Sequence, residues 1–169
     1  MICHPYRCVF IHIPKTGGIS IDHVFLRLVG LTWDTRAPLL LRGNDDPTKG
    51  PPRLAHLKGT EYVSCGHLSP EQFEAYFKFS FVRNPWDRMV SEYKYRGHPM
   101  RMSFKNWLFG HLPEPSFSDA YCHMVPQHEF HLRWRGEAYR RLRGTVRVPA
   151  GGLRDRVPAD RHTARAPAA

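Results

Sequence analysis

Two short apolar runs, each followed at once by a turn and then by a helix signal, constrain the fold of this 169-residue chain most strongly. Residues 8–13 are apolar and rich in β-formers, and they end at a proline and a Gly-Gly pair before helical spacing begins after Ser20. Residues 78–82 form the second run, which Asn84 and Pro85 follow as a helix N-cap and first helical residue. Strands that alternate with helices in this way predict an α/β fold with a mainly parallel sheet.

Weaker local signals lie between and after these runs. Residues 33–60 are rich in proline and glycine and predict a long irregular excursion of the kind that faces a substrate. Residues 61–65 predict a short strand. Ser69, followed by Pro and then by Gln at the third helical position, predicts a capped helix to about Tyr76. Ser103 predicts the cap of a further helix.

The net charge of +10 is concentrated at the C-terminal end. Residues 131–169 carry ten arginines against three acidic residues, a net +7, whereas residues 1–130 carry only +3. Because the apolar periodicity also fades there, we expect one domain over residues 1–130 and an Arg/Ala/Pro-rich, poorly ordered tail over 131–169. One hypothesis for this coincidence is a frameshift near residue 131, which would leave the domain incomplete. A second is a tail that binds nucleic acid or an anionic surface without sequence selectivity, so no specific nucleic-acid partner is expected.

The cysteines and histidines carry no metal signature. The four cysteines form no Cys-x-x-Cys pair and the eleven histidines no His-x-x-x-His pair, so we expect no metal and reduced, mostly buried thiols. No apolar run reaches the ~18 residues of a membrane-spanning helix, and no signal peptide is evident. These features predict a soluble, cytoplasmic protein.

Residues 14–20, which read Pro-Lys-Thr-Gly-Gly-Ile-Ser, have the composition of an anion-binding loop. Glycines let backbone N–H groups turn inward, a following helix N-terminus favours negative charge, and Lys15 adds a mobile cation. A Walker A loop places its lysine after the glycines, so this segment is not one. Arg83, at a strand end, and Ser91, about two helical turns further on, suit one phosphate group. The alternatives are an ordinary Gly-Gly turn and a structural Arg83.

Residues 10–20 and 79–93 resemble the two nucleotide-binding motifs of sulfotransferases, in the branch that contains the carbohydrate sulfotransferases. This resemblance implies a P-loop-like three-layer fold, with a mainly parallel central sheet flanked by helices. It also implies transfer of a sulfuryl group from 3′-phosphoadenosine 5′-phosphosulfate (PAPS) to a hydroxyl of a carbohydrate acceptor, with no metal. Animal relatives are Golgi membrane proteins, so association with the Golgi membrane is the alternative location.

The resemblance also assigns roles to individual residues. Lys15 is expected to neutralise the departing phosphate, and His67, in a Gly-His context similar to that of the uronosyl 2-O-sulfotransferases, is the candidate general base. The alternative is that His67 only hydrogen-bonds the turn before the capped helix. His12 is expected to be mainly structural. The residues expected to hold PAPS are Lys15, Thr16, Gly17, Gly18 and Ser20 at the 5′-phosphosulfate, and Arg83 and Ser91 at the 3′-phosphate.

Two departures from the family pattern define a competing interpretation. Ile19 stands where the family usually has a threonine, which removes a phosphate hydrogen bond of about 1 kcal/mol. The apolar strand and the acidic-aromatic segment that family members carry later are not found after His131. The alternative is therefore an inactive domain that only binds adenosine 3′,5′-bisphosphate or another anion.

Overall fold

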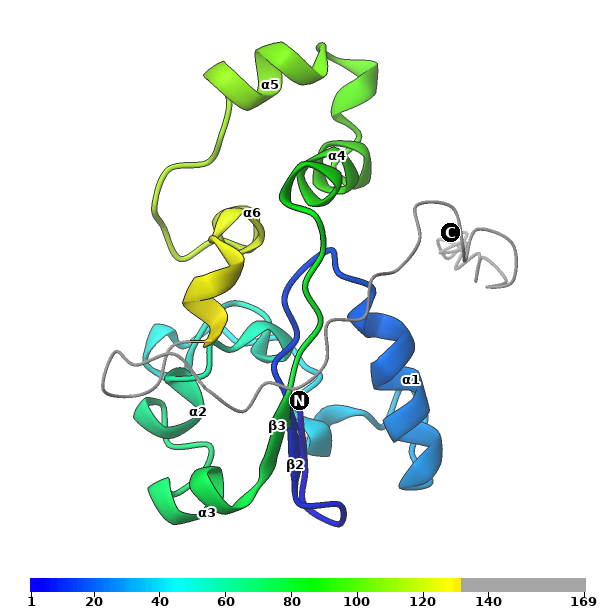
Figure 1. The fold of residues 1–169 in the computed structure, drawn as a ribbon, viewed down its shortest axis with the longest axis vertical. Helices are drawn as coiled ribbons and strands as arrows, with labels where there is room; N and C mark the ends of the chain where they lie inside the picture. The colour runs from blue at the N-terminus through cyan, green and yellow to red at the C-terminus, as the bar shows by residue number, and fades with distance from the viewer. Residues whose placement is uncertain (132–169) are drawn as a thin grey trace, which may run out of the picture.

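The computed structural model describes residues 1–131, which build a small three-stranded sheet between helices (Figure 1). The strands lie in the order β1 (Ile2–Cys3), β2 (Cys8–Phe10) and β3 (Phe77–Phe79). β2 pairs in parallel with β3 and antiparallel with β1. The mixed α/β class is confirmed, but a mainly parallel, P-loop-like sheet is not, because only one of the two strand pairs is parallel. The predicted tail lies, from residue 132 onward, outside the described residues.

Helices lie on both sides of this sheet and above the carboxyl ends of its parallel strands (Figure 1). α1 covers one side, whereas α2 and α3 lie on the other, and α4 follows β3. Residues 33–60 contain short 3₁₀ turns and one isolated β-bridge between Gly43 and Arg53, in agreement with the predicted irregular excursion. The helices are α1 (Gly18–Leu28), α2 (Glu61–Ser64), α3 (Pro70–Ala75), α4 (Pro85–Tyr95), α5 (Phe104–Gly110) and α6 (Asp119–Met124).

The predicted strand at residues 61–65 is wrong, because this segment forms α2. The Glu61 carboxylate accepts a hydrogen bond from the Lys58 backbone N–H at 2.6 Å, which stabilises the start of the helix. Tyr62 is fully buried, and its hydroxyl donates to the backbone oxygen of Phe10 at 3.1 Å. One buried side chain in so short a segment is compatible with either structure, so tertiary packing decides between them.

The predicted helix caps are confirmed. Ser69 accepts a hydrogen bond from the Gln72 N–H and forms a full capping box, and the Asn84 side chain caps α4. Ser103 caps α5. The N-cap of α1 is Gly17, so Ser20 lies within the first turn of that helix.

β2 is the centre of the core because both of its faces are buried. Successive strand side chains point to opposite faces, and the run continues this alternation beyond the last strand residue. One face packs on the side of α2 and α3, and the other on the side of α1. The first cluster includes Val9, Ile11, Ile13, Tyr62 and Phe73, and the second includes Cys8, Phe10, Leu26, Leu39 and Leu41.

A buried arginine connects the loop after β2 to α4 and α6. Arg88 lies on α4 and is only 3% exposed, although its side chain is charged. Its guanidinium donates to the backbone oxygens of Pro14 at 3.0 Å, Val125 at 2.9 Å and His123 at 2.6 Å. One side chain therefore fixes three chain segments that do not contact one another through regular secondary structure.

Replacement of Arg88 by methionine should lower the free energy of unfolding by about 3 kcal/mol or more, since three buried carbonyl groups lose their donor. Urea denaturation followed by circular dichroism measures this change. Arg101→Met is the matched control, because Arg101 is exposed, and should change stability by less than about 0.5 kcal/mol. Equal stability of the two variants would show that Arg88 does not hold these segments together.

Candidate functional site

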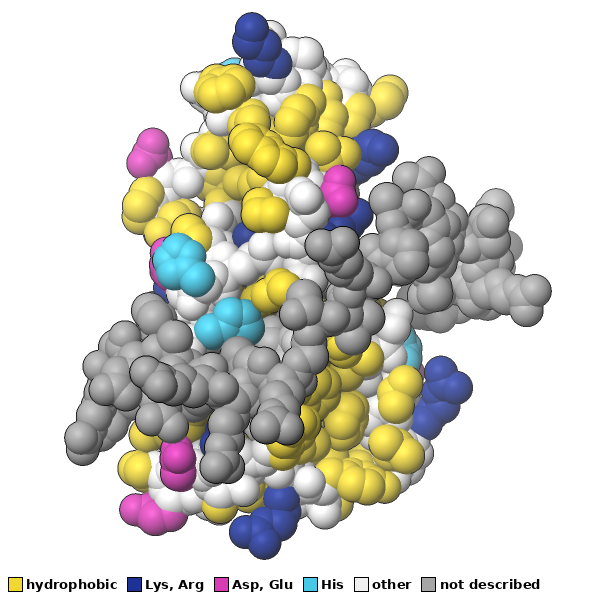
Figure 2. All heavy atoms as spheres, in the orientation of Figure 1, with side chains coloured by type: hydrophobic (Ala, Val, Ile, Leu, Met, Phe, Trp, Pro, Cys, Tyr) yellow, Lys and Arg dark blue, Asp and Glu magenta, His cyan; other side chains and the backbone are white. Residues whose placement is uncertain are grey.

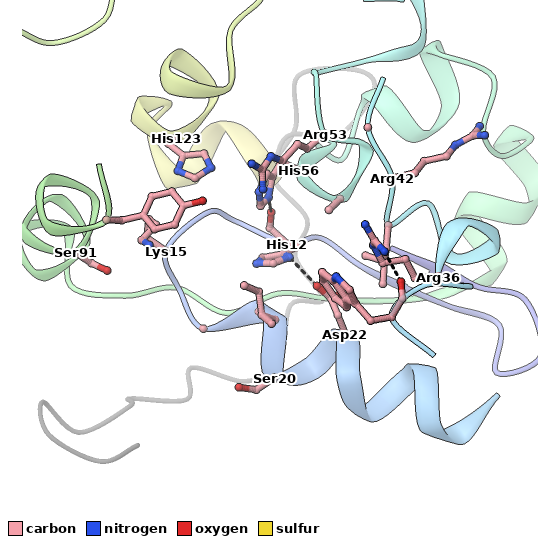
Figure 3. A pocket seen from close by; sticks show the side chains of 18 of the residues that line it. His12, Lys15, Ser20, Asp22, Arg36, Arg42, Arg53, His56, Ser91 and His123 are labelled. Atoms are coloured by element: carbon pink, nitrogen blue, oxygen red, sulfur yellow. Dashed lines mark hydrogen bonds and ion pairs between the residues drawn. The ribbon is translucent and has the colours of Figure 1, made fainter. Parts of the chain in front are cut away.

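A cavity of about 670 Å³ opens where the loops after β2 and β3 meet the irregular excursion (Figure 3). The loop after β2 and the first turn of α1 form one part of its wall, and α4 forms another. Residues of the 33–60 segment and of α6 complete it. The carboxyl ends of adjacent parallel strands are where α/β folds bind their ligands, and this cavity lies at that place.

The structure brings most of the predicted site residues into this one cavity. Thr16 is buried and does not line it, because its hydroxyl donates to the Ile13 backbone oxygen at 2.8 Å. His67 does not line it either. Its Nε2 lies 2.7 Å from the Lys49 backbone oxygen, and it faces a second cavity that shares Arg42 and Gly43 with the first. The predicted residues that do line the cavity are Lys15, Gly17, Gly18, Ser20, Arg83 and Ser91.

The loop before α1 exposes the start of this helix to the cavity. Gly17 adopts a left-handed backbone with φ +89°, and the N-terminus of α1 has no side-chain cap among the described residues. Its first backbone N–H groups therefore remain available to an anion, and the helix dipole favours one there. Gly18 permits close packing, since a Cβ atom at this position would lie 2.2 Å from His12 Nε2.

Lys15 places a cation at the same cavity, over a ring of α4. Its Nζ lies 3.7 Å from the centroid of the Tyr95 ring. Burial lowers the pKa of Lys15, Glu92 raises it in part, and Arg96 and Arg83 lower it further. The neighbourhood of the ammonium group is thus rich in positive charge, which an entering anion would offset.

Arg83 is held at the cavity by its backbone and stays exposed. Its N–H donates to Gln127 Oε1 at 2.9 Å, and Gln127 Nε2 donates back to the Arg83 oxygen at 2.8 Å. Its guanidinium donates to the Lys15 backbone oxygen at 3.4 Å. The two cationic residues predicted to bind phosphate groups, Lys15 and Arg83, are therefore neighbours in the cavity wall. The reciprocal Gln127 contact is not among the predictions, because it joins residues 44 positions apart in the chain.

Three buried histidines line the cavity, and two of them were not anticipated. His12, in the first motif, lies 3.3 Å from a carboxylate oxygen of Asp22. The His56 ring lies between His12 and His123, with ring centroids 4.8 Å and 5.2 Å away and edge-to-face geometry. His56 and His123 occur in no recognisable sequence motif. Their place in the cavity wall therefore becomes evident only from the tertiary structure.

The end of the cavity formed by the excursion is aromatic and cationic. The Trp33 ring stacks on His23 at 5.1 Å between centroids, and the Arg36 guanidinium lies 4.5 Å over Trp33. Arg42 and Arg53 line the same region, and Arg53 also pairs with Asp119 at 3.1 Å. This end offers both a flat ring face and hydrogen-bond donors to a polar ligand.

These features define an α/β protein with a candidate anion site at a strand–loop–helix junction. The family model described as "Sulfotransferase family" matches residues 1–132, and the chain belongs to this family. It is 28% identical over 93 residues to carbohydrate sulfotransferase 10 of Danio rerio, an alignment that covers 55% of this chain and 24% of that protein. The chain thus matches about a quarter of the length of this curated relative. No solved structure matches it significantly.

Residues 1–131 contain neither a candidate membrane span nor a metal-type cluster. None of the helices in this range has the length and apolar character needed to cross a bilayer. The same residues contain no cluster of three or more His, Cys, Asp or Glu side chains that could hold a metal ion.

Alanine at position 18 should disturb the site through His12, because the added Cβ would overlap a buried ring that has little room to move. We expect Gly18→Ala to lower the free energy of unfolding by about 1–3 kcal/mol in a urea titration. Gly110→Ala is the matched control: Gly110 lies in α5 with open space around its Cα, and alanine there should be neutral or slightly stabilising. Unchanged stability of Gly18→Ala would contradict the close contact.

Proposed function

We propose that this chain is a sulfotransferase that moves a sulfuryl group from PAPS to a hydroxyl of a carbohydrate acceptor. The observation that carries the proposal is the meeting of Lys15, the uncapped start of α1, Arg83 and Ser91 in one cavity. Membership of the sulfotransferase family supports the reaction class, and the similarity to carbohydrate sulfotransferase 10 of Danio rerio supports a carbohydrate acceptor.

The two halves of the donor would use different parts of the wall. The N–H groups at Gly17 and Gly18, with the Ser20 hydroxyl, suit the 5′-phosphosulfate, whose charge is delocalised over several oxygens. Arg83 and Ser91 suit the 3′-phosphate, and their separation from the α1 terminus would distinguish PAPS from a nucleotide without that group. Thr16 stabilises the conformation of this loop through the hydrogen bond that its hydroxyl donates to the Ile13 backbone oxygen.

Lys15 would act on the leaving group. As the sulfur–oxygen bond to the 5′-phosphate breaks, negative charge develops on the bridging oxygen, and an ammonium group near it stabilises the transition state. A lysine over an aromatic ring, with no carboxylate bound to its Nζ among the described residues, can turn toward such an oxygen at low cost.

The excursion would hold the acceptor. A saccharide presents an apolar ring face and a rim of hydroxyls, and the Trp33 ring beside Arg36 and Arg42 supplies the matching surfaces. The acceptor would then approach the sulfur from the side opposite the nucleotide, as in-line transfer requires.

Calorimetric titration with adenosine 3′,5′-bisphosphate beside AMP tests the donor site. We expect the bisphosphate to bind at least 10-fold more tightly than AMP, and Arg83→Ala to lose this preference because it removes a charge-assisted contact. Arg27→Ala, an exposed arginine on α1 that does not line the cavity, should leave both affinities unchanged. Equal binding of the two nucleotides by the unmodified chain would refute the assignment of Arg83 and Ser91.

Threonine at position 19 should strengthen donor binding. Ile19 lines the cavity and is 58% exposed, so a hydroxyl there would reach a phosphate oxygen without disturbing the core. Ile19→Thr should increase affinity for adenosine 3′,5′-bisphosphate about 5-fold, equivalent to ~1 kcal/mol, in the same titration. Ile19→Val, which lacks the hydroxyl, should show no such gain, and an equal gain would contradict the hydrogen-bond explanation.

Release of adenosine 3′,5′-bisphosphate from PAPS distinguishes an enzyme from a binding module. The acceptors are oligosaccharides of desulfated chondroitin and heparosan and the 4-nitrophenyl glycosides of galactose and glucuronic acid. We expect one or more of them to raise the release rate above hydrolysis. Tight binding of the bisphosphate without any turnover would instead support the inactive domain. That alternative is suggested by Ile19, which stands where the family usually has a threonine.

A further inference from the structure

His56 presents an unpaired ring nitrogen to the cavity beside residues 14–17, the loop proposed to hold the sulfuryl donor and called the donor loop below. It ends the 3₁₀ turn Leu54–His56, is 7% exposed and lines the cavity (Figure 3). The His12 ring is its neighbour at 4.8 Å between centroids, and His12 in turn packs directly against Gly18. His56 is therefore one side chain away from the helix start that would hold the sulfuryl group.

The hydrogen bond of His56 fixes its tautomer. Nδ1 lies 3.1 Å from the His12 backbone oxygen, and a carbonyl oxygen only accepts hydrogen bonds, so Nδ1 carries the proton. A neutral imidazole protonated at Nδ1 has its lone pair on Nε2. Nε2 has no hydrogen-bond partner among residues 1–131, so this lone pair is available to a ligand.

The surroundings of His56 keep the ring neutral. Burial lowers its pKa well below 6.5, and the neighbouring His12 and His123 lower it further, against a smaller opposing effect of the bond to the His12 oxygen. Arg53 on the same turn also lowers it. At pH 7 the unprotonated form, which can accept a proton, is therefore the dominant one.

The other histidines near the cavity are less open to a ligand than His56. His123 bonds Glu92 through Nδ1 at 2.8 Å, and its Nε2 has no hydrogen-bond partner among residues 1–131 but is sealed from solvent, 3.6 Å from Asp119. His12 Nδ1 is likewise sealed without a hydrogen bond, 3.3 Å from Asp22, and the other edge of the ring lies against Gly18. His67 uses Nε2 at the Lys49 oxygen and faces the second cavity.

We propose that His56 is the general base that takes the proton from the acceptor hydroxyl, an inference that rests on the proposed sulfotransferase function. The acceptor oxygen forms a bond to sulfur while its proton moves to His56 Nε2. The bond between sulfur and the bridging oxygen of the 5′-phosphate breaks, and its electron pair stays on that oxygen, beside Lys15. The resulting imidazolium keeps its Nδ1–H bond to His12 and returns the proton to water after the product leaves.

Nitrogen-15 NMR of the histidine-labelled chain tests the tautomer without any need for turnover. The His56 signals, assigned by their loss in His56→Asn, should show a protonated Nδ1 and an unprotonated Nε2 from pH 6.5 to 8. A protonated Nε2 at pH 7 would overturn the proposal, because His56 would then have no lone pair to offer.

Kinetics of PAPS turnover test the role itself, with the best saccharide of the panel as acceptor, or water where none exceeds hydrolysis. His56→Asn keeps an amide that can donate to the His12 oxygen but lacks a basic nitrogen. Its kcat should fall at least 100-fold, while KM for PAPS and affinity for adenosine 3′,5′-bisphosphate change less than about 2-fold. The unmodified chain should lose kcat as the pH falls through the lowered pKa of His56, well below 6.5, and this acid limb should be absent from His56→Asn.

His111→Gln, an exposed histidine at the end of α5, is the matched control and should keep full kcat. His67→Gln tests the other candidate base. A larger loss of kcat in His67→Gln than in His56→Asn would overturn the proposal. So would a His56→Asn or His56→Gln variant that is folded and keeps its kcat. Failure of the unmodified chain to bind adenosine 3′,5′-bisphosphate would instead refute the proposed function, and the inference with it.

Discussion

The site depends on the buried guanidinium of Arg88. Three backbone carbonyls from the loop after β2 and from the end of α6 converge on one side chain of α4. A buried cation costs desolvation energy, which these bonds and the nearby Glu92 carboxylate offset. The loop that carries Lys15 therefore has its position fixed relative to the helix that carries Ser91, although the two lie 76 positions apart in the chain.

The polarity of the cavity follows from how its charges are paired. The buried carboxylates of Asp22 and Glu92 each lie next to a histidine, and Glu92 also accepts from Arg96 at 2.7 Å. Glu92 is thus paired within the wall, whereas Asp22 keeps one buried carboxylate oxygen, Oδ1, without a hydrogen-bond partner among residues 1–131. Figure 2 shows that, around the described part of the chain, apolar side chains cover much of one face and the basic groups are scattered. The lining of the cavity, by contrast, brings Lys15, Arg36, Arg42, Arg53 and Arg83 together around one space.

Much of the local structure was predictable because it is set by short-range chemistry. Ser69, Asn84 and Ser103 cap helices because their side-chain oxygens reach backbone N–H groups two or three residues on, and no distant contact is needed. The strand at residues 61–65 was predicted wrongly because Tyr62 is buried by long-range packing that a five-residue pattern does not encode. β1 was missed for the same reason, since two residues become a strand only by pairing with β2.

The sequence by itself determined the strand–loop–helix units, the anion-binding composition of residues 14–20 and the resemblance that led to the sulfotransferase family. Those properties reside in contiguous residues, whose spacing and backbone preferences are fixed along the chain. Only the tertiary structure decided which histidines share the cavity with the donor loop, because His56 reaches His12 across 44 positions and His123 reaches Glu92 across 31. Folding placed His67 at a neighbouring cavity and gave His56 its free nitrogen, since a ring's partners depend on what packs beside it.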